Sequence, residues 1–172
     1  GDNSLTDWRN VEQGSRAIDA ALVAGELDSV GVPLPVDAQM FDVLPISRQL
    51  LWVVARHGSR FDGASEVRLP ELASEPFVFY GESLALNDVV TRACRTAGFA
   101  PQLVSRRRHW DFMAALGHAG VGIALLPAPY CRRLDPAHFT CRPVVEPEIR
   151  WEMAIAWRRS VYLSHAARAW LE

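Results

Sequence analysis

The sequence predicts an α/β protein built around parallel strands. Strand-like and helix-like segments alternate through the middle of the chain, and short apolar runs typical of strands buried on both faces recur between them. Of its 172 residues, 49% are hydrophobic and 22% are charged, which is the balance of an ordinary soluble globular protein. A chain of this length can form one domain or two small lobes.

The first third of the chain contains a predicted helix and two predicted strands. Apolar residues recur at helical spacing over residues 5–13, after the good N-cap Ser4 and before Gly14. The apolar run at 18–25 predicts a strand buried on both faces, and the prolines that follow predict a loop up to residue 40. Residues 41–56 return to an extended pattern, and a single helical turn is expected at 69–73.

From residue 77 onward, strands and helices alternate regularly. The predicted order is strand, helix, strand, helix, strand, helix over FVFY, LNDVVTRACRTAGF, PQLVSR, WDFMAALGHAG, VGIALLP and APYCRRL. Gly98 and Gly120 stand where helix ends need left-handed residues. Two further extended segments, FTCRPVV and WEMAIAWRR, precede a closing amphipathic helix over YLSHAARAWL.

Charge and cysteine content limit the classes of function. The formal net charge of −2 lacks the overall basic character that binding to a phosphate backbone would require. The three cysteines form no CxxC pair, which favours a reducing cytoplasm and structural thiols over a disulfide-stapled secreted fold. The longest apolar run is far below the ~18 residues of a membrane span. We therefore expect a cytoplasmic protein that makes no contact with a membrane.

Several segments together resemble the effector-binding domain of LysR-type transcriptional regulators. They are, in chain order, GDNS, IDAALVAGELD, LLWVVARHGSRF, LPELASEPFVFY, AGFAP, AGVGIALLPA and YLSHAARAWL. The resemblance covers essentially the whole chain and rests on their order and spacing. It implies a periplasmic-binding-protein type II-like fold, with two Rossmann-like lobes joined by two crossover strands. Lobe I would comprise residues 1–50 and 150–172, and lobe II residues 51–149.

The resemblance also implies a function and a missing part. Members of the family carry a strand, a helix and a second strand before the position of Gly1, so we expect an N-terminally truncated fragment with an incomplete lobe I. The implied function is to bind a small organic molecule, expected to be an anion, in the interlobe cleft. Binding would control a helix-turn-helix domain outside this sequence, through which alone the protein would contact DNA. A homodimer or homotetramer is implied, and an enzyme is not.

Six residues are candidates for contact with the effector. In such folds, ligands bind at the carboxyl ends of parallel strands and at helix N-termini. Ser4 and Ser83 stand at predicted helix starts, although simple N-capping also explains them. Arg108 could pair with a carboxylate and Trp110 could stack on an aromatic effector, but a solvated strand end and a core tryptophan are equally open. The resemblance places Leu126 and Pro127, at the end of the GIALLP strand, against the ligand.

Other functions are open to the same sequence. The GESLA segment at 81–85 is close to the nucleophile elbow of serine hydrolases, with Ser83 as nucleophile and Asp135 and His138 or His165 later in the chain. Its fifth position lacks the usual glycine, and no oxyanion-loop motif is visible. A periplasmic solute-binding protein of the same fold is a second alternative, and it would need a secretion signal.

No cofactor and no metal is expected. The GVG at 120–122 joins a helix to a strand, whereas a dinucleotide fingerprint joins a strand to a helix. The five histidines show no spacing typical of metal ligands.

Overall fold

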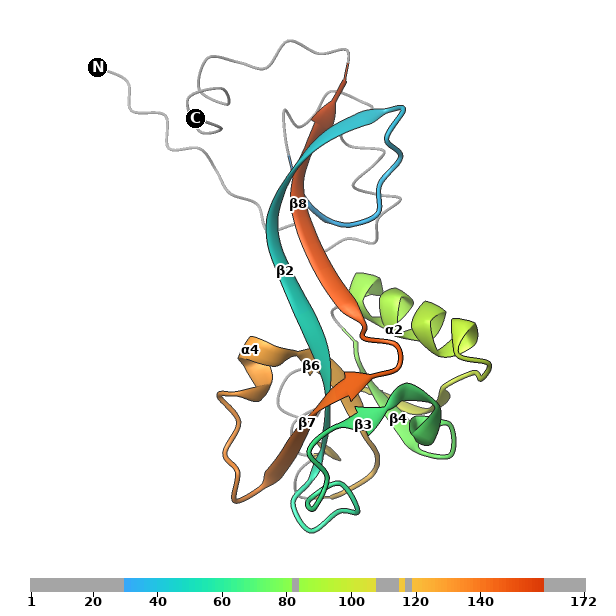
Figure 1. Ribbon diagram of the computed structural model, residues 1–172, viewed down its shortest axis with the longest axis vertical. Coiled ribbons are helices and arrows are strands. Elements are labelled where there is room, and N and C mark those ends of the chain that lie inside the picture. Colours follow the sequence, from blue (N-terminus) through green and yellow to red (C-terminus); the bar gives the residue numbers. More distant parts are fainter. Residues whose placement is uncertain (1–29, 82–83, 108–114, 117–118, 160–172) are drawn as a thin grey trace, which may run out of the picture.

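The computed structural model describes residues 30–81, 84–107, 115–116 and 119–159 (Figure 1). In chain order these hold β1 (Val30–Pro33), β2 (Phe41–Arg56), β3 (Val67–Arg68), the 3-10 turn η1 (Leu69–Leu72), β4 (Pro76–Tyr80), α2 (Leu84–Thr96), β5 (Gln102–Arg107), β6 (Ala124–Pro127), α4 (Ala128–Cys131), β7 (Phe139–Val145) and β8 (Arg150–Arg158). The predicted helix at 5–13, the predicted strand at 18–25 and the closing helix lie outside the described residues.

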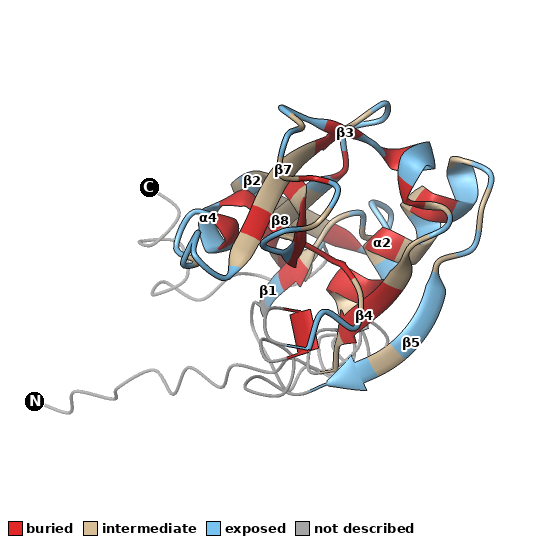
Figure 2. Cartoon of the chain, turned by 90° about the horizontal axis from the view of Figure 1, so that it is seen from below, coloured by how far each residue is buried: buried red, intermediate tan, exposed pale blue. Residues whose placement is uncertain are grey.

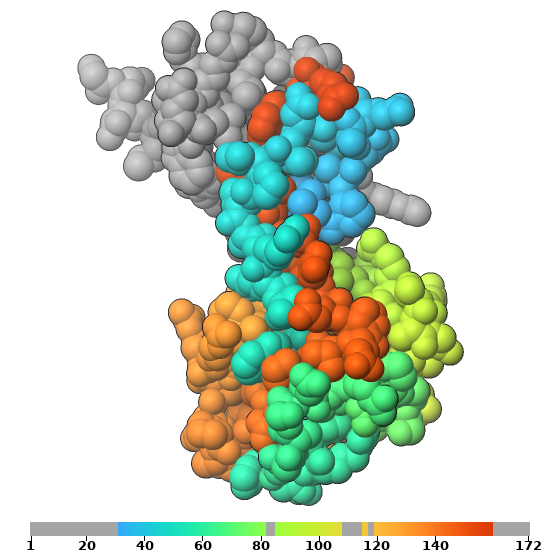
Figure 3. Space-filling view, viewed as in Figure 1, coloured from blue at the N-terminus to red at the C-terminus, as the bar shows by residue number. Residues whose placement is uncertain are grey.

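The long strand β2 organises the molecule, because it changes its partners halfway along. From Phe41 to Leu50 it pairs with β8, and from Leu51 to Arg56 it pairs with β6 and β7, antiparallel in every case. The second half is the apolar LLWVVAR segment, whose residues 51 and 53–55 are buried. In Figure 3 the β2 and β8 atoms form a narrow link between the blue loop region and the larger assembly below. This larger part holds β3 to β7, α2 and α4 (Figure 1), and we call it the lower assembly.

Three strands of the lower assembly run parallel. β4 pairs with β5, and Phe77 of β4 forms a parallel bridge with Ile123, just before β6. The bridge requires glycine at 122, since a Cβ there would lie 2.4 Å from the Pro76 carbonyl oxygen. Two backbone hydrogen bonds of 2.8 Å, Ile123 N–H to Pro76 O and Val78 N–H to Ile123 O, hold the contact.

The main core lies between this sheet and helix α2 (Figure 2). Apolar residues of α2 recur at helical spacing, and the buried ones, Leu86, Val90 and Cys94, pack against the sheet. A second cluster, on Val54, Val78, Leu116 and Cys131 among others, includes the short helix α4. Both core clusters contain residues of β2, which are Leu51, Val53 and Ala55 in the first and Val54 in the second. The half of β2 from Leu51 onward is therefore held in the core.

One sequence prediction needs correction. The stretch up to residue 40 was expected to be loop, but Val30–Pro33 forms β1 and pairs with β8. Pro33 is compatible with a strand there because it is the last residue of β1, which lies at the edge of the sheet within the described residues. The parallel strands predicted from the alternation after residue 77 are confirmed by the β4–β5 pair and the Phe77–Ile123 bridge, whereas β2, which precedes this alternation, is antiparallel to β6, β7 and β8. The helical turn expected at 69–73 is confirmed as η1.

Candidate functional site

The parallel strands β4, β5 and β6 end at one edge of the sheet. Tyr80 is level with Arg107 in the β4–β5 pair, and the Phe77–Ile123 bridge brings the end of β6 to the same level. We call the ends of these three strands, at Tyr80, Arg107 and Pro127, the carboxyl edge. Because Pro127 lies opposite Leu51, the carboxyl edge faces the point where β2 changes partners. Ligands of open α/β sheets bind at such an edge.

Short backbone contacts fix the carboxyl edge after β4. The Gly81 N–H donates to the Arg107 carbonyl at 2.9 Å, and a Cβ on Gly81 would lie 3.4 Å from that oxygen. Asn87 is only 5% exposed, and its Nδ2 donates to the Tyr80 carbonyl at 2.9 Å. The first turn of α2 is therefore tied to the end of β4. Sequence reasoning missed Asn87, although a polar residue in the apolar stripe of a helix was a usable signal.

Leu126 and Pro127, both predicted to contact the effector, are brought to this edge. Leu126 lies opposite Trp52 and is partly buried, packing against both core clusters. Pro127 is buried, and its backbone leads directly into α4. Part of the Leu126 side chain is therefore accessible at the carboxyl edge, whereas Pro127 is buried beneath its surface. Ser4, Ser83, Arg108 and Trp110 lie outside the described residues.

One face of β2 carries apolar and cationic side chains together. Residues directly opposite each other on paired strands share a face, and so do alternate residues of one strand. Leu50 lies opposite Arg150, and Trp52 lies opposite Leu126. These four residues therefore share one face at the level where β2 changes partners, and we call them the waist face. The guanidinium of Arg132 lies 5.3 Å from the centre of the Trp52 ring on its border.

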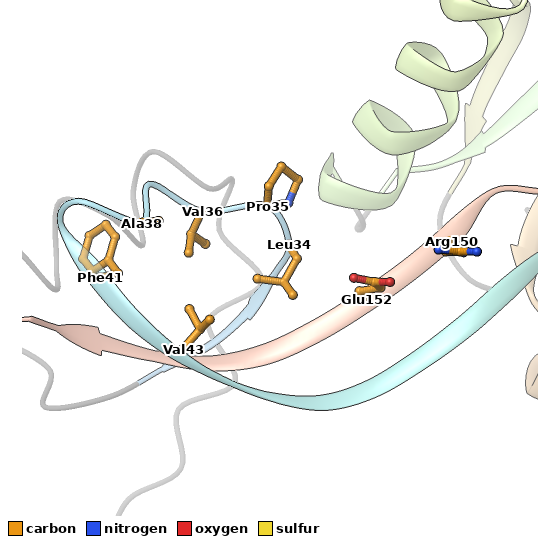
Figure 4. Close-up of a pocket in the computed structure, with 8 residues that line it drawn as sticks. All are labelled: Leu34, Pro35, Val36, Ala38, Phe41, Val43, Arg150 and Glu152. Atoms are coloured by element: carbon orange, nitrogen blue, oxygen red, sulfur yellow. The ribbon is translucent and has the colours of Figure 1, made fainter.

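A hollow of about 440 Å³ opens beside the waist face (Figure 4). Its apolar lining comes from the β1–β2 connection and the start of β2, and consists of Leu34, Pro35, Val36, Ala38, Phe41 and Val43. Arg150 and Glu152 of β8 line its polar end. Arg48 Nε pairs with Glu152 Oε1 at 2.6 Å, which offsets the charge of that carboxylate. Sequence reasoning could not predict this hollow, because Arg150 and Leu50 are brought together only by strand register.

Cations also mark the end of β5. Arg107 is exposed at the carboxyl edge, and the guanidinium of Arg106 lies 5.9 Å from the centre of the Phe79 ring.

Within the described ranges, no group of three or more His, Cys, Asp or Glu side chains is placed to hold a metal ion. No helix of the described part of the chain is long and apolar enough to cross a membrane.

Comparison with known proteins assigns the family. A family model described as the LysR substrate binding domain matches residues 7–172. The chain belongs to this family. The HTH-type transcriptional regulator YwbI of Bacillus subtilis (strain 168) is 39% identical over 162 residues, which are 94% of this chain and 54% of YwbI. The malonate utilization transcriptional regulator of Klebsiella pneumoniae is 32% identical over 114 residues, 64% of this chain and 34% of that protein.

Solved structures agree with this LysR assignment. The C-terminal domain of a probable LysR family transcriptional regulator from Rhodococcus sp. RHA1 superposes with a TM-score of 0.76 at 27% identity, covering 91% of this chain and 78% of that one. The effector binding domain of QuiR in complex with shikimate gives 0.73 at 15% identity, covering 92% and 75%, which is a likeness of fold.

The predicted family and fold are thus confirmed. The chain is a LysR-type effector-binding domain with the periplasmic-binding-protein type II-like fold. The curated relatives named above are transcriptional regulators rather than enzymes. The matched part of the chain spans about half the length of YwbI and about a third of the length of the malonate utilization regulator.

Proposed function

We propose that this domain senses a small organic anion beside the waist face and thereby controls a DNA-binding region of a longer regulator. The observation that carries the proposal is the waist face itself. There the apolar Leu126 of β6 and the cationic Arg150 of β8, each paired with a residue of β2, lie on the same face of the sheet. The proposed action is binding, without a catalytic step.

The proposed effector site lies between two lobes. We take lobe I to comprise residues 1–50 and 150–172, and lobe II residues 51–149. The change of β2 partners between Leu50 and Leu51 supports this division, as does the start of β8 at Arg150. β2 and β8 are then the two crossover strands, and closure of the lobes on a ligand would bend this two-stranded ribbon.

The chemistry of the waist face favours an amphipathic anion. A carboxylate can accept two parallel hydrogen bonds from a guanidinium such as that of Arg150. The apolar body of the ligand would lie against Leu126 and the apolar lining of the neighbouring hollow. Two LysR-type proteins point the same way by name, the malonate utilization regulator and the QuiR domain in complex with shikimate, since both molecules are carboxylates.

The remaining predicted contacts complete the proposal. We place Ser4 and Ser83 at helix starts on the two sides of the ligand, and Arg108 and Trp110 beyond the end of β5. Pro127 would hold the carboxyl edge in shape rather than offer much surface, because it is buried.

Signalling requires that the effector bind one arrangement of the lobes better than another. A change of lobe closure would alter the spacing of paired DNA-binding regions, and hence their fit to two half-sites. The acting protein would be a cytoplasmic homodimer or homotetramer, in which this domain contacts the effector and another region contacts DNA.

Isothermal titration tests the proposal with a panel of small carboxylates, including malonate and shikimate, and their neutral amides. We expect the acids to bind better than the amides, and Arg150→Gln to weaken the best acid roughly 10- to 100-fold through loss of a charge-assisted hydrogen bond. Arg68→Gln is the matched control, because Arg68 is exposed on β3 and pairs with Glu71. Equal affinities for Arg150→Gln and the wild type would refute the assignment of the anion site.

A further inference from the structure

Two cysteines from different elements meet next to the waist face, in the core cluster against which Trp52 and Leu126 pack. Cys131 is the last residue of α4 and is 3% exposed, and Cys141 lies on β7 opposite Val54 and is half-buried. The Cys141 thiol donates to the Cys131 carbonyl at 3.6 Å. Both side chains belong to the same core cluster. The two cysteines are therefore neighbours in space, although their spacing in the sequence does not indicate a pair.

The two thiols differ in acidity. The neighbouring Cys131 side chain lowers the pKa of Cys141, helped by the nearby Arg142 guanidinium and opposed by burial. The neighbouring Cys141 side chain, together with burial, raises the pKa of Cys131. A thiolate therefore forms first at Cys141, the more accessible of the pair, while Cys131 keeps its proton.

We propose that Cys131 and Cys141 are a redox-active dithiol that closes to a disulfide on reaction with a peroxide. The Cys141 thiolate attacks one peroxide oxygen, the O–O bond breaks, and the departing alkoxide or hydroxide takes up a proton. The resulting sulfenic acid is attacked by the Cys131 sulfur, the S–O bond breaks, and water leaves with the Cys131 proton. In sum, two thiols and one peroxide give one disulfide, one alcohol or water, and one water.

The location gives the disulfide a consequence for the effector site. In the reduced protein, the Cys131 thiol donates to the Leu126 carbonyl at 3.6 Å. The disulfide removes that donor and ties α4, which follows Pro127 directly, to β7. Oxidation would thus change the support of Leu126 on the waist face, a consequence that rests on the proposed function. Formation of the disulfide itself does not rest on it.

Cys94 is the matched control within the chain. It is fully buried on α2 in the other core cluster, and burial raises its pKa to about 11. Since the pKa of Cys141 is lowered and that of Cys94 is raised, Cys141 has the larger thiolate fraction at neutral pH.

Peptide mapping after titration of the reduced full-length protein with hydrogen peroxide tests the proposal. We expect the Cys131–Cys141 linked peptide to be the main oxidised species, to disappear with dithiothreitol, and to form equally in Cys94→Ser. In Cys131→Ser, dimedone should trap a sulfenic acid at Cys141, and in Cys141→Ser no linked peptide should form.

Alkylation of the unmodified protein provides a second measurement that needs no variant to fold. Iodoacetamide at neutral pH should label Cys141 faster than Cys94, because Cys141 is the more accessible thiol and has the larger thiolate fraction. Free Cys131 and Cys141 thiols after peroxide treatment, or equal labelling of Cys141 and Cys94, would overturn the proposal. Neither measurement uses an effector, so failure here is distinct from failure of the proposed function.

Discussion

Substitution of Gly122 by alanine should separate β6 from β4 and damage the carboxyl edge. The added Cβ would lie 2.4 Å from the Pro76 carbonyl oxygen and 3.0 Å from its carbon, both of them backbone atoms that no side-chain rotation can move away. The strand would have to retreat by about 1 Å to restore ordinary contact. That movement stretches both 2.8 Å hydrogen bonds that join Ile123 to β4.

The magnitude follows from these contacts. Overpacking of a tight site costs about 1–3 kcal/mol, and each weakened backbone hydrogen bond adds up to about 1 kcal/mol. Gly122→Ala should therefore lower the free energy of unfolding by about 1–5 kcal/mol. For a chain of this size, that corresponds to a fall in Tm of roughly 2–20 °C.

Urea unfolding followed by tryptophan fluorescence measures this cost. Gly63→Ala is the matched control, because a Cβ at Gly63 meets no atom within 4 Å and its φ is not positive. It should be neutral or stabilise by up to about 1 kcal/mol through the unfolded state. Equal unfolding midpoints for Gly122→Ala and Gly63→Ala would refute the close packing of β6 on β4.

Two further predictions concern the described polar contacts. Asn87→Ala removes the donor to the Tyr80 carbonyl and should lower the free energy of unfolding by about 1–3 kcal/mol, whereas the exposed neighbour Asp88→Ala should not; equal midpoints in urea would contradict this. Hydrogen bonds from Thr140 and from the Gly58 N–H lower the pKa of Asp62 below its ordinary 3.8, so the ionised carboxylate stabilises the fold above that pH and loses its effect as the pH falls below it. Asp62→Asn should therefore be less stable than the wild type at pH 7, and the gap should shrink in acid; a gap independent of pH would rule out this role.

Much of the lower assembly was predictable from local patterns. The order of β4, α2, β5, β6, α4 and β7 follows the predicted alternation, because buried strands and amphipathic helices leave different periodicities. Strand direction was harder to predict. An apolar run such as LLWVVAR indicates a buried strand but carries no information on whether its neighbours run parallel or antiparallel.

The site was predictable only in part. The position of Leu126 and Pro127 at the carboxyl edge could be predicted, because they end a strand in a segment that resembles a known family. Arg150 could not, since its place on the waist face depends on pairing with Leu50, far away in the sequence. Register of this kind is set by tertiary packing and is not written in the neighbouring residues.

The most direct test of the account is hydrogen exchange of the protein with and without a bound carboxylate from the titration panel. The account predicts slower exchange in three segments when the ligand is bound: the end of β4 with the start of α2, the end of β6, and the first residues of β8. Failure of every carboxylate to bind, or protection confined to segments away from the waist face and the carboxyl edge, would contradict it.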